Sequence, residues 1–259
     1  MKAKQIINTG LIICLLSAAI FAGCSGGKNN TADEEDPYLW LEDVEGDKAL
    51  DWVRSQNRHT EEAFTARPLF NILNERFTEV INDKEQIVYP EIVGKYVYNL
   101  WQDEKNESGL WRRMPLADYL DDSKEWEVVL DLDILSENED KKWVFHGVEW
   151  LLTENRYCLV YLSDGGKDES YVREFDVVEK AFVSDGFSVD ESKGSVSWID
   201  RDNILVASDF GRGTMSSSGY PLVVKHLRRG TKIEDAIKVI EADTTYMGIF
   251  VSAINSGSK

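Results

Sequence analysis

Hydrophobic and polar positions change their period once along the chain. From residue 47 to about residue 81, apolar residues recur at the three- and four-residue spacing of amphipathic helices. One helix is expected from Asp47, as its N-cap, to about Ala66, and a second with Pro68 in its first turn. The second helix carries an apolar face made of Leu69, Ile72, Leu73, Phe77, Val80 and Ile81. The pattern therefore predicts an N-terminal helical segment over residues 37–83.

Beyond Asp83 the helical spacing gives way to short β-rich runs separated by Asp, Gly, Asn and Ser. Three of these runs are alike, since each is an apolar strand that ends in a polar turn and is followed by a second strand. The strands cover residues 96–103, 157–164 and 204–209, and their partners begin near Trp111, Tyr171 and Pro221. Trp150 and Trp198 precede the second and third copies. Asp164 and Asp209 are 45 residues apart, which is close to the length of one four-stranded propeller blade.

The repeat predicts a mainly β fold, a partial, open β-propeller of about three blades over residues 84–259, preceded by the helical segment. Antiparallel hairpins of a β-sandwich give a similar pattern, so a sandwich stays as an alternative. The run over residues 246–251 is expected to form the first strand of a fourth blade. An open propeller leaves its end faces uncovered, and we therefore expect exposed apolar residues in residues 36–82 and after residue 240.

The N-terminus has the features of a secretory signal. Lys2 and Lys4 precede an almost uncharged apolar run over residues 6–22, and the run Phe21-Ala22-Gly23-Cys24 resembles a bacterial lipobox. This predicts a lipoprotein signal peptide over residues 1–23, lipid attachment at Cys24 and a flexible tether over residues 24–36. The membrane is then a partner through the lipid, and the chain lies in the bacterial cell envelope, on the periplasmic or outer-membrane side. The alternative is a plain signal peptide or short anchor in which Cys24 is an ordinary thiol.

Composition excludes one class of partner. The chain has 259 residues with 47 acidic against 29 basic side chains, a net charge of -18. Nucleic acid is bound by clustered Lys and Arg that release counterions, so no nucleic-acid partner is expected. With Cys14 inside the signal and Cys24 lipidated, Cys158 has no cysteine left for an internal disulfide. It lies in an apolar run, which predicts a buried, unreactive thiol.

Several motifs in the same order resemble the prolyl oligopeptidase family of serine peptidases, in its bacterial branch. The run Asp36-Pro37-Tyr38-Leu39-Trp40-Leu41-Glu42-Asp43, followed by Trp52-Val53 and Gln56-Asn57, looks like the opening of these enzymes. Further similar stretches lie at residues 98–103, 109–113, 164–168, 172–176, 195–200, 209–211, 218–221 and 229–231. The resemblance covers the chain from Asp36 to its C-terminus.

This resemblance implies a helical segment, a β-propeller that limits substrate size, and an α/β-hydrolase domain that carries a Ser, Asp, His triad and cleaves short peptides after proline. Set against that plan, the chain is expected to end within the propeller and to lack the hydrolase domain.

No catalytic residue is predicted, and none of the triad can be carried over. No serine has the G-x-S-x-G spacing of a nucleophile elbow, and the run Ser216-Ser217-Ser218 is expected to form a polar loop. The histidines His59, His146 and His226 are expected to be surface or core residues. The chain is therefore predicted to be inactive by itself.

No metal or cofactor site is predicted either. Asp131 and Asp133 begin like a calcium loop, but Leu135, Ser136 and Lys142 stand where a ligand, the turn glycine and the bidentate glutamate are needed. The glycines match no phosphate-binding fingerprint.

Three hypotheses about function follow. The first is the gating and scaffold part of a prolyl oligopeptidase-like serine endopeptidase, with peptides or a missing hydrolase domain as partners. The second is an autonomous lipid-anchored propeller module that binds a peptide or a protein. The third is a nonfunctional product of a truncated gene.

Overall fold

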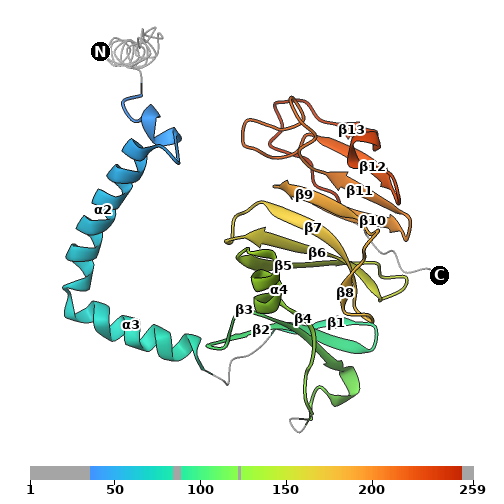
Figure 1. Cartoon of the computed structure of the whole chain (residues 1–259), viewed down its shortest axis with the longest axis horizontal. Coiled ribbons are helices and arrows are strands. Elements are labelled where there is room, and N and C mark those ends of the chain that lie inside the picture. Colours follow the sequence, from blue (N-terminus) through green and yellow to red (C-terminus); the bar gives the residue numbers. More distant parts are fainter. Residues whose placement is uncertain (1–35, 84–88, 122–123, 253–259) are drawn as a thin grey trace, which may run out of the picture. The chain divides into compact units, whose positions relative to one another are not determined.

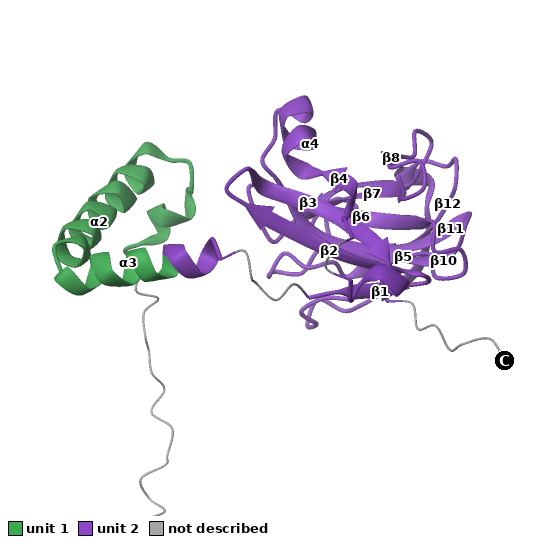
Figure 2. Cartoon of the chain, turned by 90° about the horizontal axis from the view of Figure 1, so that it is seen from below, with its two compact units in different colours: residues 1–77 green, residues 78–259 purple. Residues whose placement is uncertain are grey.

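The computed structural model describes residues 36–83, 89–121 and 124–252 (Figure 1). The chain divides into two compact units, residues 1–77 and 78–259, coloured separately in Figure 2. The first unit contains the 3-10 helix η2 (Leu39–Glu42), helix α2 (Asp47–Thr65) and most of helix α3 (Pro68–Ile81). The second unit contains every strand that the structure describes. Both predicted helices are therefore present.

Helix α2 begins without a side-chain cap. Its N-cap is Gly46 in an extended conformation, so the prediction of Asp47 as the N-cap was wrong. Asp47 instead lies in the first turn, where its negative charge is favourable beside the N-terminal end of the helix dipole. Trp40 of η2 makes an edge contact with Trp52 of α2, with ring centroids 6.2 Å apart, and Lys48 lies 4.2 Å above Trp40. These contacts join η2 to α2.

The apolar face of α3 is exposed, as the sequence predicts for this segment. Every one of its six large side chains is exposed, namely Leu69, Ile72, Leu73, Phe77, Val80 and Ile81. Helix α3 has no buried residue at all, and α2 has one, Ala49.

The second unit holds three antiparallel sheets, each formed by strands consecutive in the sequence. The sheets lie one after another in chain order, from green through yellow to red in Figure 1. Blade 1 has the order β1 (Glu91–Val93), β2 (Tyr96–Asp103), β3 (Asn106–Pro115) and β4 (Glu127–Asp131). Blade 2 contains β5 (Trp143–Trp150), β6 (Tyr157–Asp164), β7 (Ser170–Asp176), β8 (Ala181–Phe182) and β9 (Ser188–Ser192). Blade 3 has the order β10 (Ser195–Asp200), β11 (Asn203–Ala207), β12 (Val223–Arg228) and β13 (Ile237–Glu241).

This arrangement confirms the predicted open β-propeller of three blades. The three similar runs found in the sequence are the second strands β2, β6 and β11 of their blades. The first of the partner strands starts earlier than predicted, at Asn106, because Asp103 closes a tight turn. Its Oδ1 accepts hydrogen bonds from the backbone N–H groups of Lys105 at 2.9 Å and Asn106 at 3.0 Å.

The connections between strands include two 3-10 helices and one α-helix. Residues Leu116–Asp118 form η3 after β3, and Ile233–Asp235 form η4 between β12 and β13. Helix α4 (Leu132–Glu139) joins blade 1 to blade 2 and begins at Asp131, whose Oδ1 accepts from the backbone N–H groups of Asp133 and Ile134.

The outer strand of blade 2 is split in two. β8 pairs with the end of β7 at Phe175 and Asp176, whereas β9 pairs with its start. Between β8 and β9 the chain leaves the sheet and returns at Phe187. The backbone of Glu174 in β7 forms hydrogen bonds at both ends of this loop. Val183 donates its backbone N–H to the Glu174 carbonyl, and Glu174 donates its own to the Phe187 carbonyl.

Two hydrophobic clusters hold the blades together. The first lies between blades 1 and 2 and contains Tyr98, Trp111, Trp150 and Phe175. The second lies between blades 2 and 3 and contains Phe187, Trp198, Ile204, Val206 and Leu227. Each blade therefore buries one face against its neighbour, as propeller blades do.

The expected first strand of a fourth blade does not form. Residues 246–251 contain a bend and irregular backbone rather than a strand. This segment runs back along blade 3, where Ile249 donates its backbone N–H to the Pro221 carbonyl and Val251 donates to Ser195 Oγ. A polar turn at Asp243 changes the direction of the chain before this segment. The pattern of apolar residues in the sequence does not indicate this turn. Tyr246, Met247 and Phe250 are nevertheless exposed, as expected after residue 240.

Candidate functional site

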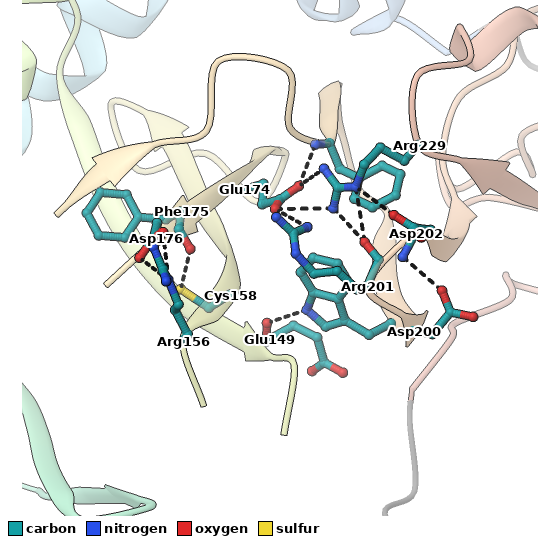
Figure 3. A network of polar contacts seen from close by, with 12 residues as sticks. Glu149, Arg156, Cys158, Glu174, Phe175, Asp176, Asp200, Arg201, Asp202 and Arg229 are labelled. Carbon is teal, nitrogen blue, oxygen red and sulfur yellow. Dashed lines mark hydrogen bonds and ion pairs between the residues drawn. The ribbon is translucent and has the colours of Figure 1, made fainter. Parts of the chain in front are cut away.

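A network of polar contacts between blades 2 and 3 is centred on Glu174 of β7 (Figure 3). Its side chain is fully buried and lies between Arg201 and Arg229. Glu174 Oε1 accepts from Arg201 Nη1 at 2.6 Å, and Oε2 accepts from Arg229 Nη1 at 2.9 Å. The backbone N–H of Phe187 donates to Oε2 as well, at 2.9 Å. We call these four residues the Glu174 latch.

The latch connects two blades. Arg201 lies in the turn between β10 and β11, and Arg229 follows β12, so both come from blade 3. Arg229 fixes Arg201 by donating from Nε at 3.1 Å and from Nη2 at 2.6 Å to the Arg201 carbonyl. Each guanidinium also lies on an aromatic ring, Arg201 at 3.7 Å from Tyr157 and Arg229 at 4.5 Å from Phe187. Charge, hydrogen bonds and ring contacts thus hold blade 3 against blade 2.

The electrostatics of the latch suit a structural role. Burial raises the pKa of Glu174, while the Phe187 N–H group and the Arg201 charge act in the opposite direction. Both carboxylate oxygens are occupied by donors, which leaves none to act as a general base. Removing the charged partners of such a buried carboxylate strongly destabilises the folded state.

A second carboxylate closes the neighbouring turn of blade 2. Asp176 accepts from Arg156 Nε and Nη2, the shorter bond being 2.7 Å, and from the backbone N–H groups of Val178 and Glu179. Burial raises the pKa of Asp176, but Arg156 and the two N–H groups outweigh it and leave the pKa below its usual value. Figure 3 shows this pair beside the buried Cys158.

A cleft of about 530 Å³ lies beside the latch. Its apolar wall contains Phe187, Leu227 and Ile233, and its rim carries Asp185, Lys232 and Glu234. This volume is in the range of small-molecule sites, but the lining brings together no nucleophile and base.

His146 contacts a serine hydroxyl. His146 occupies a bulge of β5, and its Nε2 lies 2.7 Å from Ser163 Oγ. Ser163 is completely buried within β6, so its hydroxyl cannot reach a substrate. The pair therefore lacks what a nucleophile needs, namely access to the reacting carbonyl.

The other two histidines make single local contacts. His59 Nδ1 lies 2.9 Å from the Ser55 carbonyl within α2, and His226 Nε2 lies 2.8 Å from Asn203 Oδ1 within blade 3. Neither contact has the Ser–His–carboxylate geometry of a triad.

The serine run over residues 216–218 forms a polar loop, as predicted. Ser216 Oγ accepts the backbone N–H of Tyr220, and the Ser216 carbonyl accepts that of Gly219, whose φ is +74°. This is a turn rather than the sharp strand-to-helix elbow of a hydrolase.

The aspartates at the start of α4 are committed to the fold. Asp131 caps the helix, while Asp133 accepts the backbone N–H groups of Ser108 at 2.9 Å and Gly109 at 3.2 Å. Within the described residues, no three His, Cys, Asp or Glu side chains are grouped as a metal site.

The cysteines separate into two groups. Cys14 and Cys24 lie outside the described residues, and so do the predicted signal peptide and most of the predicted tether. Cys158 is buried as predicted, and burial raises the pKa of its thiol. No helix in the described part of the chain is long and apolar enough to cross a membrane.

The family follows from comparison with known proteins. Residues 28–257 match the model of the prolyl oligopeptidase N-terminal β-propeller domain, which is most of the chain. The chain belongs to this family. The structure of a post-proline cleaving enzyme from Rickettsia typhi aligns with a TM-score of 0.75 and 34% identity, over 81% of this chain and 31% of that enzyme.

Two uncharacterized peptidases are similar in sequence. Peptidase y4nA of Sinorhizobium fredii is 36% identical over 208 residues, 80% of this chain and 29% of that protein. Peptidase RP174 of Rickettsia prowazekii is 34% identical over 250 residues, 92% of this chain and 34% of that protein. The chain thus spans about a third of the length of the relatives it matches. Oligopeptidase B of Leishmania major, 14% identical with a TM-score of 0.61, shares the fold.

Sequence reasoning missed the latch. Glu174 is separated from its two arginines by 27 and 55 residues, so no local spacing reveals that they meet. One signal was present, because Glu174 and Arg229 lie in stretches that resemble the family.

Proposed function

We propose that this chain is the gating and scaffold part of a prolyl oligopeptidase-like serine peptidase, with the bond-breaking groups supplied by an α/β-hydrolase domain. The observation that carries the proposal is the agreement between most of the chain and the propeller domain of this family. The described residues contain no accessible nucleophile–base pair, which agrees with bond cleavage by a separate hydrolase domain.

The geometry suggests how gating would operate. The first strands β5 and β10 contact each other at the inner side of adjacent blades, where propellers have their central channel. Side chains on these strands would limit what passes along that channel, and the Glu174 latch would keep blades 2 and 3 from separating. Substrate size, rather than the chemical step, would be controlled here.

A chimera tests the proposal. Residues 91–241 would replace the corresponding blades of the post-proline cleaving enzyme from Rickettsia typhi, and cleavage would be measured on a short proline-containing peptide and on an unfolded protein of the same cleavage sequence. We expect the chimera to cleave the short peptide and to exclude the protein, as the parent enzyme should. Equal cleavage of both substrates by a folded chimera would contradict a gating role.

Lipid anchoring is a second proposal, independent of gating. The basic start, the apolar run and Cys24 support a lipid-modified N-terminus in the bacterial envelope. It implies that the peptidase acts on peptides outside the cytoplasm.

A further inference from the structure

The cleft beside the Glu174 latch lies between loops of two adjacent blades. Residues 185–188, which lead from β8 into β9, form its blade 2 wall, and Leu227 with residues 230–234 forms its blade 3 wall. Both blades are present in the described residues, and they pack against each other through the second hydrophobic cluster and the latch. The cleft therefore belongs to a completed contact between blades and is not a blade face without its neighbour.

The position of the cleft separates it from the channel proposed for gating. In a blade of consecutive antiparallel strands, the connection from the third to the fourth strand lies at the end opposite to where the first strand begins. The cleft is built from two such connections, the one after β7 and the one between β12 and β13. It therefore opens beside the outer strands of blades 2 and 3, whereas the channel lies along the first strands.

The floor of the cleft is apolar and fixed from behind. Phe187 and Leu227 are buried, and the Phe187 ring makes an edge contact with Trp198, with ring centroids 5.7 Å apart. Ile233 is half-buried and packs on the same cluster. The cleft thus offers a preformed surface for an apolar side chain.

The rim of the cleft carries charges of both signs. Asp185 comes from blade 2, whereas Lys232 and Glu234 come from blade 3. Within the part of the chain that the structure describes, none of these three side chains forms an ion pair, although Arg229 close by is paired with Glu174. Two carboxylates and one ammonium group are therefore available around an apolar floor.

We propose that this cleft binds a short peptide that has free ends and an apolar side chain. The ammonium group of the peptide would lie beside Asp185 and Glu234, and its carboxylate would lie beside Lys232. Its apolar side chain would lie on Phe187 and Ile233. A volume of about 530 Å³ is in the range of sites for molecules of this size. This inference does not depend on the gating role.

Three forms of one dipeptide test the proposal. The full chain, isotopically labelled at its glycines, would be titrated with leucylphenylalanine, with its N-acetyl form and with its C-terminal amide. The backbone N–H resonance of Gly230 would report binding in the cleft, and that of Gly94, in the β1–β2 turn, would serve as a reference. Gly230→Asn assigns the first resonance, because Asn tolerates the φ of +74° at this position.

We expect the free dipeptide to shift the Gly230 resonance saturably and to leave that of Gly94 in place. Each capped form should bind about threefold more weakly, as for the loss of one exposed charge pair. Glycylglycine keeps both charges but has no apolar side chain, and it should bind more weakly than either capped form. Equal binding of the free and both capped dipeptides would overturn the proposal.

Substitutions at the rim assign each charge. Lys232→Gln should abolish the difference between the free dipeptide and its amide, and keep the difference between the free and acetylated forms. Asp185→Asn combined with Glu234→Gln should do the reverse. Lys105→Gln, in the exposed β2–β3 turn, is the matched control and should change neither difference. Discrimination that survives these rim substitutions, or no saturable Gly230 shift at about 10 mM peptide, would also overturn the proposal.

Discussion

Trp150 of β5 donates from its indole Nε1 to Glu91 Oε1 of β1 at 3.0 Å. The same relationship recurs one blade later, where Trp198 Nε1 of β10 donates to the carbonyl of Glu149 in β5, also at 3.0 Å. In both cases a tryptophan on the first strand of a blade reaches the first strand of the preceding blade. These two tryptophans are the ones that precede the repeated runs in the sequence, so the repeat marks a structural contact between blades.

The tryptophan contact should be a large source of stability. Trp150 is 7% exposed and packs against Tyr98 and Trp111. Trp150→Ala is expected to lower the free energy of unfolding by about 3–5 kcal/mol through the cavity it leaves. Trp150→Phe keeps much of the packing and should cost less. Urea unfolding monitored by circular dichroism measures both, and equal losses for the two variants would contradict a packing role.

The Glu174 latch should stabilise the contact of blade 3 with blade 2 by an amount similar to that of the Trp150 contact. Glu174→Gln keeps the side-chain shape but leaves Arg201 and Arg229 without a carboxylate, and we expect a loss of about 3 kcal/mol. The matched control is Glu179→Gln, whose side chain is 70% exposed and lies 3.6 Å from Arg156. This control should stay within about 1 kcal/mol of the wild type. A Glu174→Gln chain as stable as the control would show that the latch contributes nothing.

Acid should weaken the contact between blades 1 and 2. Glu127 of β4 accepts from Arg113 of the same blade and pairs with Lys180 of blade 2, and these hydrogen bonds lower its pKa from 4.5 to about 2. Because the folded pKa is depressed, the stabilisation is present above pH 4.5 and is lost as the pH falls toward 2. The side chain is 44% exposed, so screening limits the effect to on the order of 1 kcal/mol.

Chemical denaturation between pH 6 and about pH 3 measures this slope. Glu127→Gln should make the stability change less with pH over that range, whereas Glu125→Gln, in the exposed segment before β4, should leave the slope as it is. Identical slopes for Glu127→Gln and wild type would mean that other carboxylates carry the acid sensitivity.

Lipid anchoring predicts a fractionation result. Expressed in a bacterium, the wild-type chain should sediment with membranes, and Cys24→Ala should release it or leave it unprocessed. Cys14→Ala is the matched control and should behave like the wild type. A soluble wild-type chain that begins at Ser25 or later would contradict the lipobox interpretation.

The sequence predicted the blades better than their connections. Apolar runs that end in aspartate located β2, β6 and β11, because a half-buried strand and its turn leave a local pattern. Residues 246–251 have the same apolar character, yet hydrogen bonds to Pro221 and Ser195 hold them beside blade 3 without a ladder. A local sequence pattern cannot distinguish a strand from an irregular segment of this kind, because the result depends on hydrogen-bond partners that are distant in the sequence. The same holds for Glu174 and its arginines.

The central proposal is that this chain contributes structure and access control, and no bond cleavage. The most direct test is the rate of post-proline cleavage by the purified full chain on a short fluorogenic peptide. We expect no cleavage above background, because Ser163, the one serine whose hydroxyl contacts a histidine in the described residues, is buried. Cleavage that persists through further purification and is abolished by His146→Ala would contradict the account.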